Sequence, residues 1–363
     1  MSVICLCLGL LVLWAPRLNI DDNIAADPRL EPYQTPKNAQ YCADWALGVR
    51  SHGHVSVSFE LPRNADLLFF LSRGPVYGHI HVINGGTASG PVIVNVSAQS
   101  HDGGNLRRTK AEPRNPHGDP RRDVQFNITI ILKTGGFYKD LTTELALFNH
   151  SFDPFFSWGS LFGFEAIRLW TSNASMRPLT MGYSLMGGAM FIQTSNAEVR
   201  GGFVGFTLGT QVQLTTSNGA INADMSLISR FKSNTLRAVV QTSAGPVTIN
   251  RGFTGKNAMA PASDSYFFLD VVTSFGAVTA ELFPSYEGTY DLQTSLARPE
   301  VEQDPDIRDP LGKGRNRMVI KTRVGEHALK GSMYWSQDGE TPDGFSRGAV
   351  KITTSQSPIT LFC

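Results

Sequence analysis

The stretch VQLTTSNGAI at residues 212–221 decides the expected fold of this chain. Its apolar residues alternate with polar ones up to a Thr-Ser-Asn-Gly step, and the alternation then resumes. A period of two is typical of a β-strand with one buried face. Asn218 and Gly219 both tolerate a positive φ, which favours a turn at this step. The sequence therefore predicts a strand, a turn and a second strand.

Related phrases recur along the chain. Apolar alternation around a Thr-Ser step returns at residues 167–174, 191–199, 239–249, 271–282, 292–297 and 350–361. The repeated serines are separated by 23, 22, 26, 31, 21 and 60 residues. A self-similar period in the low twenties indicates stacked β-units, none of which buries its apolar face alone. The predicted turn residues are Ser172, Ser195, Asn196, Ser217, Asn218, Gly219, Ser243, Gly245, Ser274, Gly276 and Ser355, with Ser295 in the sixth phrase.

The expected fold class is all-β, in the form of a β-solenoid-like stack of short strands with repeats of about 22–30 residues. The charged fraction of 17% is below the roughly 25% of an average globular protein, and a low charge content suits a β-rich chain. Stacking places like residues above like, so we expect a ladder of Ser, Thr and Asn side chains along one edge. The spacing is irregular, which leaves an elongated β-sandwich or meander as the alternative.

The start of the chain has the composition of a targeting segment. Thirteen apolar residues at 3–15 precede Pro16 and Arg17. A spanning helix needs about 20 residues, and the apolar part of a signal peptide about 7–15. No basic residue precedes the run, and the next small pair, Ala25-Ala26, is distant. Residues 1–16 are interpreted as a signal peptide or signal anchor, with a buried strand or helix as the alternative.

The rest of the chain divides into a linker and one domain. Residues 17–41 are polar and contain prolines, which is typical of a linker or stalk. Residues 42–363 are expected to form a single β-repeat domain with loop insertions at 101–123 and 298–317. The first insertion carries six basic and four acidic residues. It is interpreted as a solvated insertion, with a binding loop as the alternative.

Sequons and cysteines bear on the compartment. Asn95, Asn127, Asn149 and Asn173 each begin an Asn-x-Ser/Thr sequon, which predicts N-glycosylation if the chain is exported. Chance is the alternative, because the chain is rich in Ser and Thr. Cys42 and Cys363 are the two cysteines outside the apolar start, and they form a possible disulfide or two free thiols. The expected location is membrane-anchored or secreted, at the cell surface or in the secretory pathway.

Two histidine pairs are the clearest candidate metal ligands. His52 with His54, and His79 with His81, have the spacing that puts each pair on one face of a strand. Two such strands side by side would offer four imidazoles to zinc. No Asp, Glu or Cys completes such a site at ligand spacing, so these residues are interpreted as exposed histidines. We predict no metal and no cofactor.

The sequence gives no pattern for catalysis. It contains neither a G-x-S-x-G nucleophile elbow nor a complete phosphate-binding loop. Carbohydrate-cleaving enzymes need paired carboxylates. In the repeats the carboxylates are scattered, which argues against such an enzyme. The net charge of +1 gives no bulk electrostatic case for nucleic acid or for an anionic membrane surface. The scattered carboxylates are Glu198, Asp224, Asp264, Asp270 and Glu281.

The TSNG and TSNA phrases, Cys42 with Trp45, and the stretch FELPRNADLLFFLSRGPVYGHIHV at residues 59–82 together carry a resemblance. Over about residues 41–362 the chain resembles the adhesin-like TSNG β-repeat proteins, and it is similar to uncharacterised membrane or surface proteins of basidiomycete fungi. The resemblance implies a β-solenoid-like, membrane-anchored or surface protein. It carries no catalytic residues to transfer.

The expected function is a non-enzymatic extracellular or luminal β-repeat scaffold for adhesion, cell-wall association or protein binding. Its partner would be a protein or a glycan and not nucleic acid, and it would contact a membrane only through its N-terminal segment. The alternative is a carbohydrate-active enzyme with its site on an inserted loop. A groove with an inward-facing carboxylate pair about 5–10 Å apart would favour the enzyme.

Overall fold

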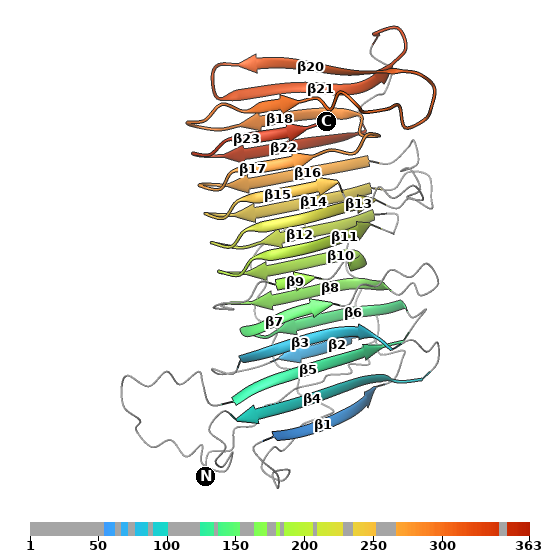
Figure 1. Cartoon of the computed structure of the whole chain (residues 1–363), viewed down its shortest axis with the longest axis vertical. Coiled ribbons are helices and arrows are strands. Elements are labelled where there is room, and N and C mark those ends of the chain that lie inside the picture. Colours follow the sequence, from blue (N-terminus) through green and yellow to red (C-terminus); the bar gives the residue numbers. More distant parts are fainter. Residues whose placement is uncertain are drawn as a thin grey trace, which may run out of the picture.

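The computed structural model describes residues 54–61, 67–71, 77–85, 90–100, 124–133, 137–152, 163–172, 179–181, 185–205, 209–227, 235–251, 266–340 and 347–363. These residues form an elongated all-β structure (Figure 1), which confirms the expected all-β class. Within these ranges no helix is long and apolar enough to cross a membrane. The N-terminal apolar run, the linker, the insertion at 101–123, His52, Cys42, Asn173 and Asp264 lie outside them.

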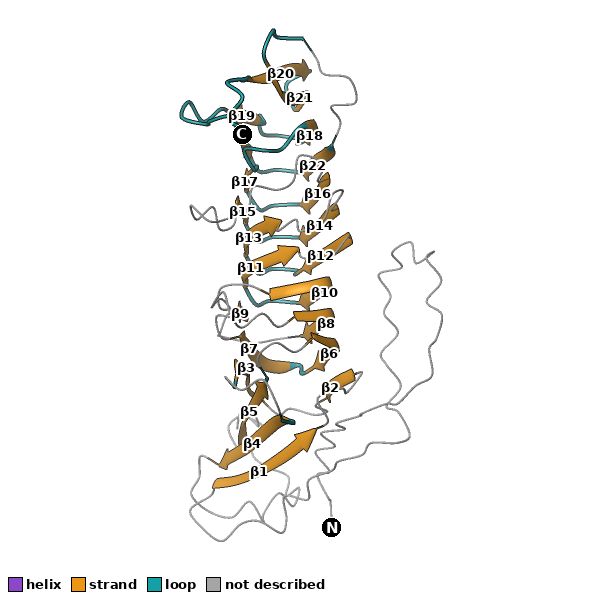
Figure 2. Ribbon diagram, turned by 90° about the vertical axis from the view of Figure 1, so that its right-hand side faces the viewer, coloured by secondary structure: helices purple, strands orange, loops and turns teal. Residues whose placement is uncertain are grey.

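The strands form two hydrogen-bonded ladders that face each other, as Figure 2 shows. Ladder 1 follows the order β2 (Leu67–Leu71), β6 (Phe137–Glu144), β8 (Gly163–Thr171), β10 (Leu185–Thr194), β12 (Gly209–Thr215), β14 (Thr235–Thr242), β16 (Tyr266–Thr273), β22 (Gly348–Thr354), β18 (Gly288–Gln293), β21 (Ala328–Ser336) and β20 (Asn316–Val324). Ladder 2 follows the order β1 (His54–Leu61), β4 (Val92–Ser100), β5 (Val124–Leu132), β3 (Tyr77–Asn84), β7 (Leu147–Phe152), β9 (Leu179–Met181), β11 (Val199–Gly205), β13 (Ile221–Leu227), β15 (Val247–Arg251), β17 (Val278–Glu281), β23 (Ile359–Phe362) and β19 (Glu300–Glu302). A short parallel pairing between β10 and β11 joins the ladders.

Strand direction separates this structure from an antiparallel meander. In the middle of ladder 1, β10, β12, β14 and β16 pair in parallel, and each pair is two strands apart in sequence. Antiparallel pairs among the described strands are confined to β1, β4 and β5 at one end and to β18, β21 and β20 at the other. A meander would instead pair sequential strands antiparallel.

The core lies between the two ladders. Alternation along β12 buries Val212 and Leu214 while their neighbours face outward. The parallel register sets Leu214 beside Val240, and Val240 beside Val271, so one apolar column continues through successive repeats. We call the two strands of one repeat, one in each ladder, a rung; β12 and β13 are an example. Ladder 2 supplies the facing column through buried residues that include Ile221. Each rung therefore buries its apolar face only because its neighbours are present.

The order of the last rungs differs from the order of the sequence. β22 and β23, which contain the final repeat, insert between the β16–β17 rung and the β18–β19 rung (Figure 1). The hairpin β20–β21 then covers the end of ladder 1. Residues 298–317, which we expected to be a loop, contain the whole of β19 and the first residues of β20.

Candidate functional site

The Thr-Ser turns stack into one continuous edge through backbone hydrogen bonds. Ser217 N donates to Ser195 O at 3.0 Å, Ser243 N to Ser217 O at 3.0 Å, and Ser274 N to Ser243 O at 3.2 Å. Near the C-terminal end of the stack, Ser295 N donates to Ser355 O of the final repeat at 3.1 Å. The repeated serines thus mark equivalent positions in successive rungs.

The threonine before each serine fixes the shape of the turn. Thr216 Oγ1 accepts a hydrogen bond from Gly219 N at 3.1 Å and donates to Ala197 O of the preceding rung at 3.4 Å. Thr242 Oγ1 repeats this pattern one rung further on, with Gly245 N at 3.2 Å and Gly219 O at 3.3 Å. A hydroxyl both donates and accepts, so it satisfies two buried backbone groups that an apolar side chain would leave unpaired.

The asparagines of the turns form part of the expected ladder. Asn218 Nδ2 donates to Asn196 Oδ1 of the preceding rung at 2.7 Å. Later rungs have other residues at this position, and two of them, Phe275 and Leu296, are largely exposed apolar side chains. The asparagine ladder is therefore short, whereas the threonine and serine contacts continue along the edge.

The glycines of the turns have a different role from the one expected. Gly219, Gly245 and Gly276 are not among the glycines with positive φ, so the predicted positive φ at Gly219 is wrong. A Cβ at Gly219 would lie 1.9 Å from Ala197 O, and one at Gly245 would lie 1.8 Å from Gly219 O. Glycine is needed here because the backbones of neighbouring rungs approach too closely for any side chain.

Three of the four predicted glycosylation sites lie on one outward face of ladder 2. Asn95 on β4 and Asn127 on β5 are exposed, and Asn149 on β7 is half-buried. The antiparallel register of β4 and β5 sets Asn95 opposite Thr129 and Ser97 opposite Asn127. The two sequons are therefore direct neighbours across the strands. Their outward position is what modification requires, and modification itself stays a prediction.

The strands that carry His54 and the pair His79 and His81 are not neighbours in ladder 2. His79 and His81 lie on the outward face of β3, with ring centroids 6.0 Å apart, and His79 Nε2 shares a hydrogen bond with Ser151 Oγ at 2.6 Å. His54 begins β1, which β4 and β5 separate from β3. β1 and β3 are therefore not the adjacent strands that the four-histidine arrangement would need, and His52 lies outside the described residues. In the described part of the chain, no group of three or more His, Cys, Asp or Glu side chains could hold a metal ion.

The outward face of ladder 1 carries a patch of uncharged side chains, which we call the glutamine face. Register sets Gln193 beside Thr215 and Thr215 beside Gln241 in one row, and Phe191 beside Gln213 in the next. All of these side chains are exposed or half-buried. The glutamine face comprises Phe191, Gln193, Gln211, Gln213, Thr215, Val239 and Gln241 on β10, β12 and β14.

Large apolar side chains border the glutamine face on both sides. Trp170 on β8, 44% exposed, lies beside Gln193. On β16, Val272 lies beside Gln241 and is 41% exposed, and Phe268 is 39% exposed. Arg168 lies next to Phe191, with its guanidinium 5.8 Å from the centre of the Phe191 ring.

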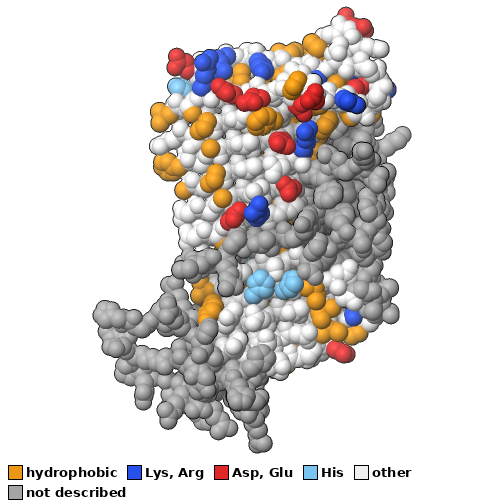
Figure 3. Space-filling model, in the orientation of Figure 1, with side chains coloured by type: hydrophobic (Ala, Val, Ile, Leu, Met, Phe, Trp, Pro, Cys, Tyr) orange, Lys and Arg blue, Asp and Glu red, His pale blue; other side chains and the backbone are white. Residues whose placement is uncertain are grey.

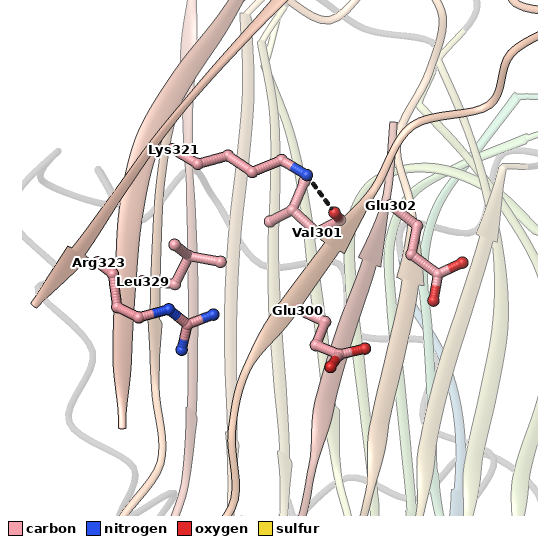
Figure 4. A pocket seen from close by; sticks show the side chains of 6 residues that line it. All are labelled: Glu300, Val301, Glu302, Lys321, Arg323 and Leu329. Atoms are coloured by element: carbon pink, nitrogen blue, oxygen red, sulfur yellow. Dashed lines mark hydrogen bonds between the residues drawn. The ribbon is translucent and has the colours of Figure 1, made fainter. Parts of the chain in front are cut away.

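A groove lies at the end of the stack, between β19 and the hairpin β20–β21 (Figure 4). Its volume is about 370 Å³, and Val301 and Leu329 supply its apolar lining. Lys321 Nζ donates to Val301 O at 2.6 Å, and Arg323 Nη2 donates to Pro299 O at 3.4 Å. These two cations therefore satisfy carbonyls along the edge of β19, which protects an otherwise open strand edge.

Two carboxylates line the same groove from one side. Glu300 and Glu302 are two residues apart on β19, and Figure 4 shows both side chains on the same side of that strand. Both residues are exposed. A glycosidase needs its two carboxyl groups on opposite sides of the bond that it cleaves. Glu300 and Glu302 therefore do not face each other across the groove.

Charged side chains gather at the end of the stack that carries the groove (Figure 3). Within this region Glu287 is buried and accepts hydrogen bonds from Trp335 N at 3.2 Å and Arg315 Nη1 at 3.5 Å. Arg315 also bonds Asp309 at 2.8 Å, and its hydrogen bonds hold the pKa of Asp309 well below the usual range. The guanidinium of Arg317 lies over the Trp335 ring at 5.2 Å. This network fastens the β20–β21 hairpin to the rung below it, so we interpret it as structural.

Cys363 is a free and buried thiol. Its Sγ donates to Glu302 O at 3.3 Å, and burial raises the pKa of the thiol. Cys42 lies outside the described residues, so its pairing with Cys363 stays a prediction.

Comparisons with known proteins add little to this description. No family model matches the chain, and no curated protein matches it significantly. Among solved structures the chain is similar to one described as a "putative cell adhesion protein" from Clostridium sporogenes, at 10% identity. The match covers 85% of this chain and 99% of the other, with a TM-score of 0.18. A likeness this weak carries no argument about function, and the narrower relation to fungal surface proteins stays a prediction.

Proposed function

We propose that this protein is a non-enzymatic extracellular or luminal scaffold for adhesion, cell-wall association or protein binding, built as a solenoid-like β-repeat stack. One observation carries the proposal: the Thr-Ser turns stack rung upon rung and leave long outward faces of exposed polar side chains in register. Such faces offer repeated, evenly spaced contacts to an extended partner or surface.

The arrangement of the carboxylates supports binding over catalysis. Glu198, Asp224, Asp270 and Glu281 lie on or beside different strands and are exposed or half-buried. Glu300 and Glu302 are the carboxylates that line the groove, and they share one wall of it. The alternative, an enzyme with its site on an inserted loop such as residues 101–123, lies outside the described residues and stays a prediction. We propose that this groove protects the end of the stack.

Export is the second part of the proposal. The outward positions of Asn95 and Asn127 suit N-glycosylation in the secretory pathway. We propose that residues 1–16 direct the chain there, either as a cleaved signal or as an anchor, and that this segment provides the membrane contact. The β-repeat stack would then face the cell exterior or the lumen.

Binding to cell walls tests the scaffold directly. The full chain, expressed in a eukaryotic secretory host, is incubated with purified cell-wall material and with intact cells. We expect retention that washing does not reverse and no release of soluble sugar from the wall. Absence of retention on both would contradict the scaffold. Sugar release that the pair Glu300→Gln and Glu302→Gln abolishes would instead establish the enzyme.

A further inference from the structure

We propose that the glutamine face binds a neutral, ribbon-like, β-linked glycan chain. This inference rests on the proposed scaffold function and names its ligand class. The face is a flat sheet surface three strands wide, and exposed aromatic side chains border it on β8 and β16. Neighbouring strands lie about 4.8 Å apart, so the five strands from β8 to β16 span roughly 19 Å.

The exposed aromatic groups provide the apolar part of the contact. Trp170 at one end, and Phe268 and Tyr266 at the other, are each about two-fifths exposed. Ring faces of this size are costly to leave in water and pack well against flat apolar surfaces. The pyranose rings of a β-linked glycan present such a surface through their axial C–H groups. Register places Val272 in the row of Trp170 and Phe268 two outward rows away, so a chain that contacts both Trp170 and Phe268 would cross the strands diagonally.

The amide side chains provide the polar part. Gln193 and Gln241 lie in one row on either side of Thr215, and Gln213 lies in the next row, so the three amides alternate between two rows on successive strands of ladder 1. An amide both donates and accepts hydrogen bonds, as a sugar hydroxyl does. An amide and a sugar hydroxyl can therefore form hydrogen bonds with each other without any charged group. This suits a ligand that has hydroxyls along both edges.

The distribution of charge selects a neutral ligand. The seven side chains that define the glutamine face are uncharged, and one exposed cation, Arg237 on β14, lies in register between Gln211 and Phe268. Arg168 is engaged with Asp140 at 3.4 Å, and Asp270 lies beside Lys351 in the register of β16 and β22. An acidic polysaccharide or a nucleic acid would find no cluster of cations here. A neutral glycan does not need a cluster of cations to bind.

The outward face of ladder 2 provides the matched control. There Thr248 and Thr279 are neighbours in register, and Arg251 forms an ion pair with Glu281 at 3.7 Å. This face is also polar, and it bears this charged pair instead of a row of amides. Substitutions on it change a sheet surface of the same stack and leave the proposed contact intact.

Sedimentation with insoluble glycans tests the proposal. Full-length protein is mixed with cellulose or chitin, and with alginate beads as an acidic control, and the bound fraction is measured over a range of glycan concentrations. We expect binding to cellulose or chitin and not to alginate. Trp170→Ala with Phe268→Ala should weaken binding at least tenfold, and Gln193→Ala with Gln213→Ala several-fold. Thr248→Ala with Thr279→Ala should bind as the wild type does.

Unfolding temperatures and sedimentation velocity accompany each variant, so that loss of folding or of self-association is recognised. Wild-type protein that adheres to cell walls but not to either neutral glycan would overturn this inference and leave the scaffold proposal standing. Glutamine-face variants that bind glycan like the wild type would overturn the location. Variants whose only change is loss of self-association would show that a second copy of the chain occupies this face.

Discussion

A single methyl group decides whether two rungs of this stack can lie at their observed spacing. A Cβ at Gly245 would be 1.8 Å from Gly219 O, which is backbone and cannot move aside. Gly245→Ala must therefore push two rungs apart, and overpacking of this kind costs about 1–3 kcal/mol or more. We expect a clearly lower unfolding temperature by circular dichroism.

Gly209 is the control for this substitution. It begins β12, and a Cβ there would meet no atom within 4 Å. Gly209→Ala should leave the unfolding temperature unchanged or raise it slightly, because alanine restricts the unfolded chain more than glycine does. Equal unfolding temperatures for Gly245→Ala and Gly209→Ala would refute the close approach of the turns.

We predict that the hydroxyl groups of the turn threonines contribute more to the stability of the fold than their methyl groups do. Thr242→Val keeps the shape of the side chain but leaves Gly245 N and Gly219 O without their partner inside the turn. An unpaired buried polar group costs about 1–3 kcal/mol. The outward-facing Thr248→Val should change the free energy of unfolding by less than about 0.5 kcal/mol. Chemical denaturation measures the free energy of unfolding of both variants. Equal decreases in the two would contradict the role given to the Thr242 hydroxyl.

His150 gives the protein a pH dependence of its own. The residue is fully buried on β7, shares a hydrogen bond with Thr143 Oγ1 at 2.7 Å, and burial lowers its pKa from 6.5 to about 3. Below pH 6.5 the unfolded chain binds a proton at this residue and the folded chain does not. Stability therefore falls as the pH drops from about 6.5 towards 3, by roughly 1.4 kcal/mol per unit from this residue.

Unfolding temperatures measured between pH 7 and pH 4 test this. His150→Asn should lower stability at pH 7 and flatten the slope below pH 6.5. A wild-type slope retained in His150→Asn would mean that other groups cause the acid sensitivity.

At the scale of elements, the hairpin β20–β21 depends on a buried charge. Glu287 accepts from Trp335 N and Arg315, and Arg347 lies 3.7 Å away. Glu287→Ala leaves Trp335 N without its acceptor and Arg347 without this carboxylate, whereas Arg315 keeps Asp309. A buried donor that loses its partner costs about 1–3 kcal/mol. We expect faster hydrogen exchange in β20 and β21, with the central rungs unaffected.

An exposed ion pair on the same hairpin provides the contrast. Lys330 Nζ lies 2.8 Å from Asp291, whose pKa is lowered because the hydrogen bonds from Lys330 and Gln293 outweigh the effect of burial. Solvent screens this pair, so Asp291→Asn should cost at most about 1 kcal/mol. Exchange in β20 and β21 that is equally fast in both variants would argue against the special role of Glu287.

At the scale of the whole molecule, the local part of the architecture could be predicted and the long-range part could not. The Thr-Ser phrases located the turn edge, because turn chemistry and strand alternation are local properties. The reason for Gly219 was missed, since the distance between rungs is not visible in one repeat. The insertion of β22 between β16 and β18 was also missed, because it depends on pairing between strands far apart in sequence.

The glutamine face left a signal that could have been found. The residue just before each Thr-Ser step points outward, and in successive rungs it is Trp170, Gln193, Thr215, Gln241 and Val272. Collecting that one position from every phrase gives a row of the face without a structure. The groove gives no such signal, because β19 and β20 meet only through the fold of the last rungs.

A surface scaffold requires export of the stack to the secretory lumen or the cell surface. An endoglycosidase mobility shift on the native protein, taken from membrane and soluble fractions, tests this directly. We predict a shift that becomes smaller in Asn95→Gln and Asn127→Gln, whose side chains are exposed on the outward face of ladder 2. A native protein with no shift, found in the cytosol, would contradict the surface-scaffold account.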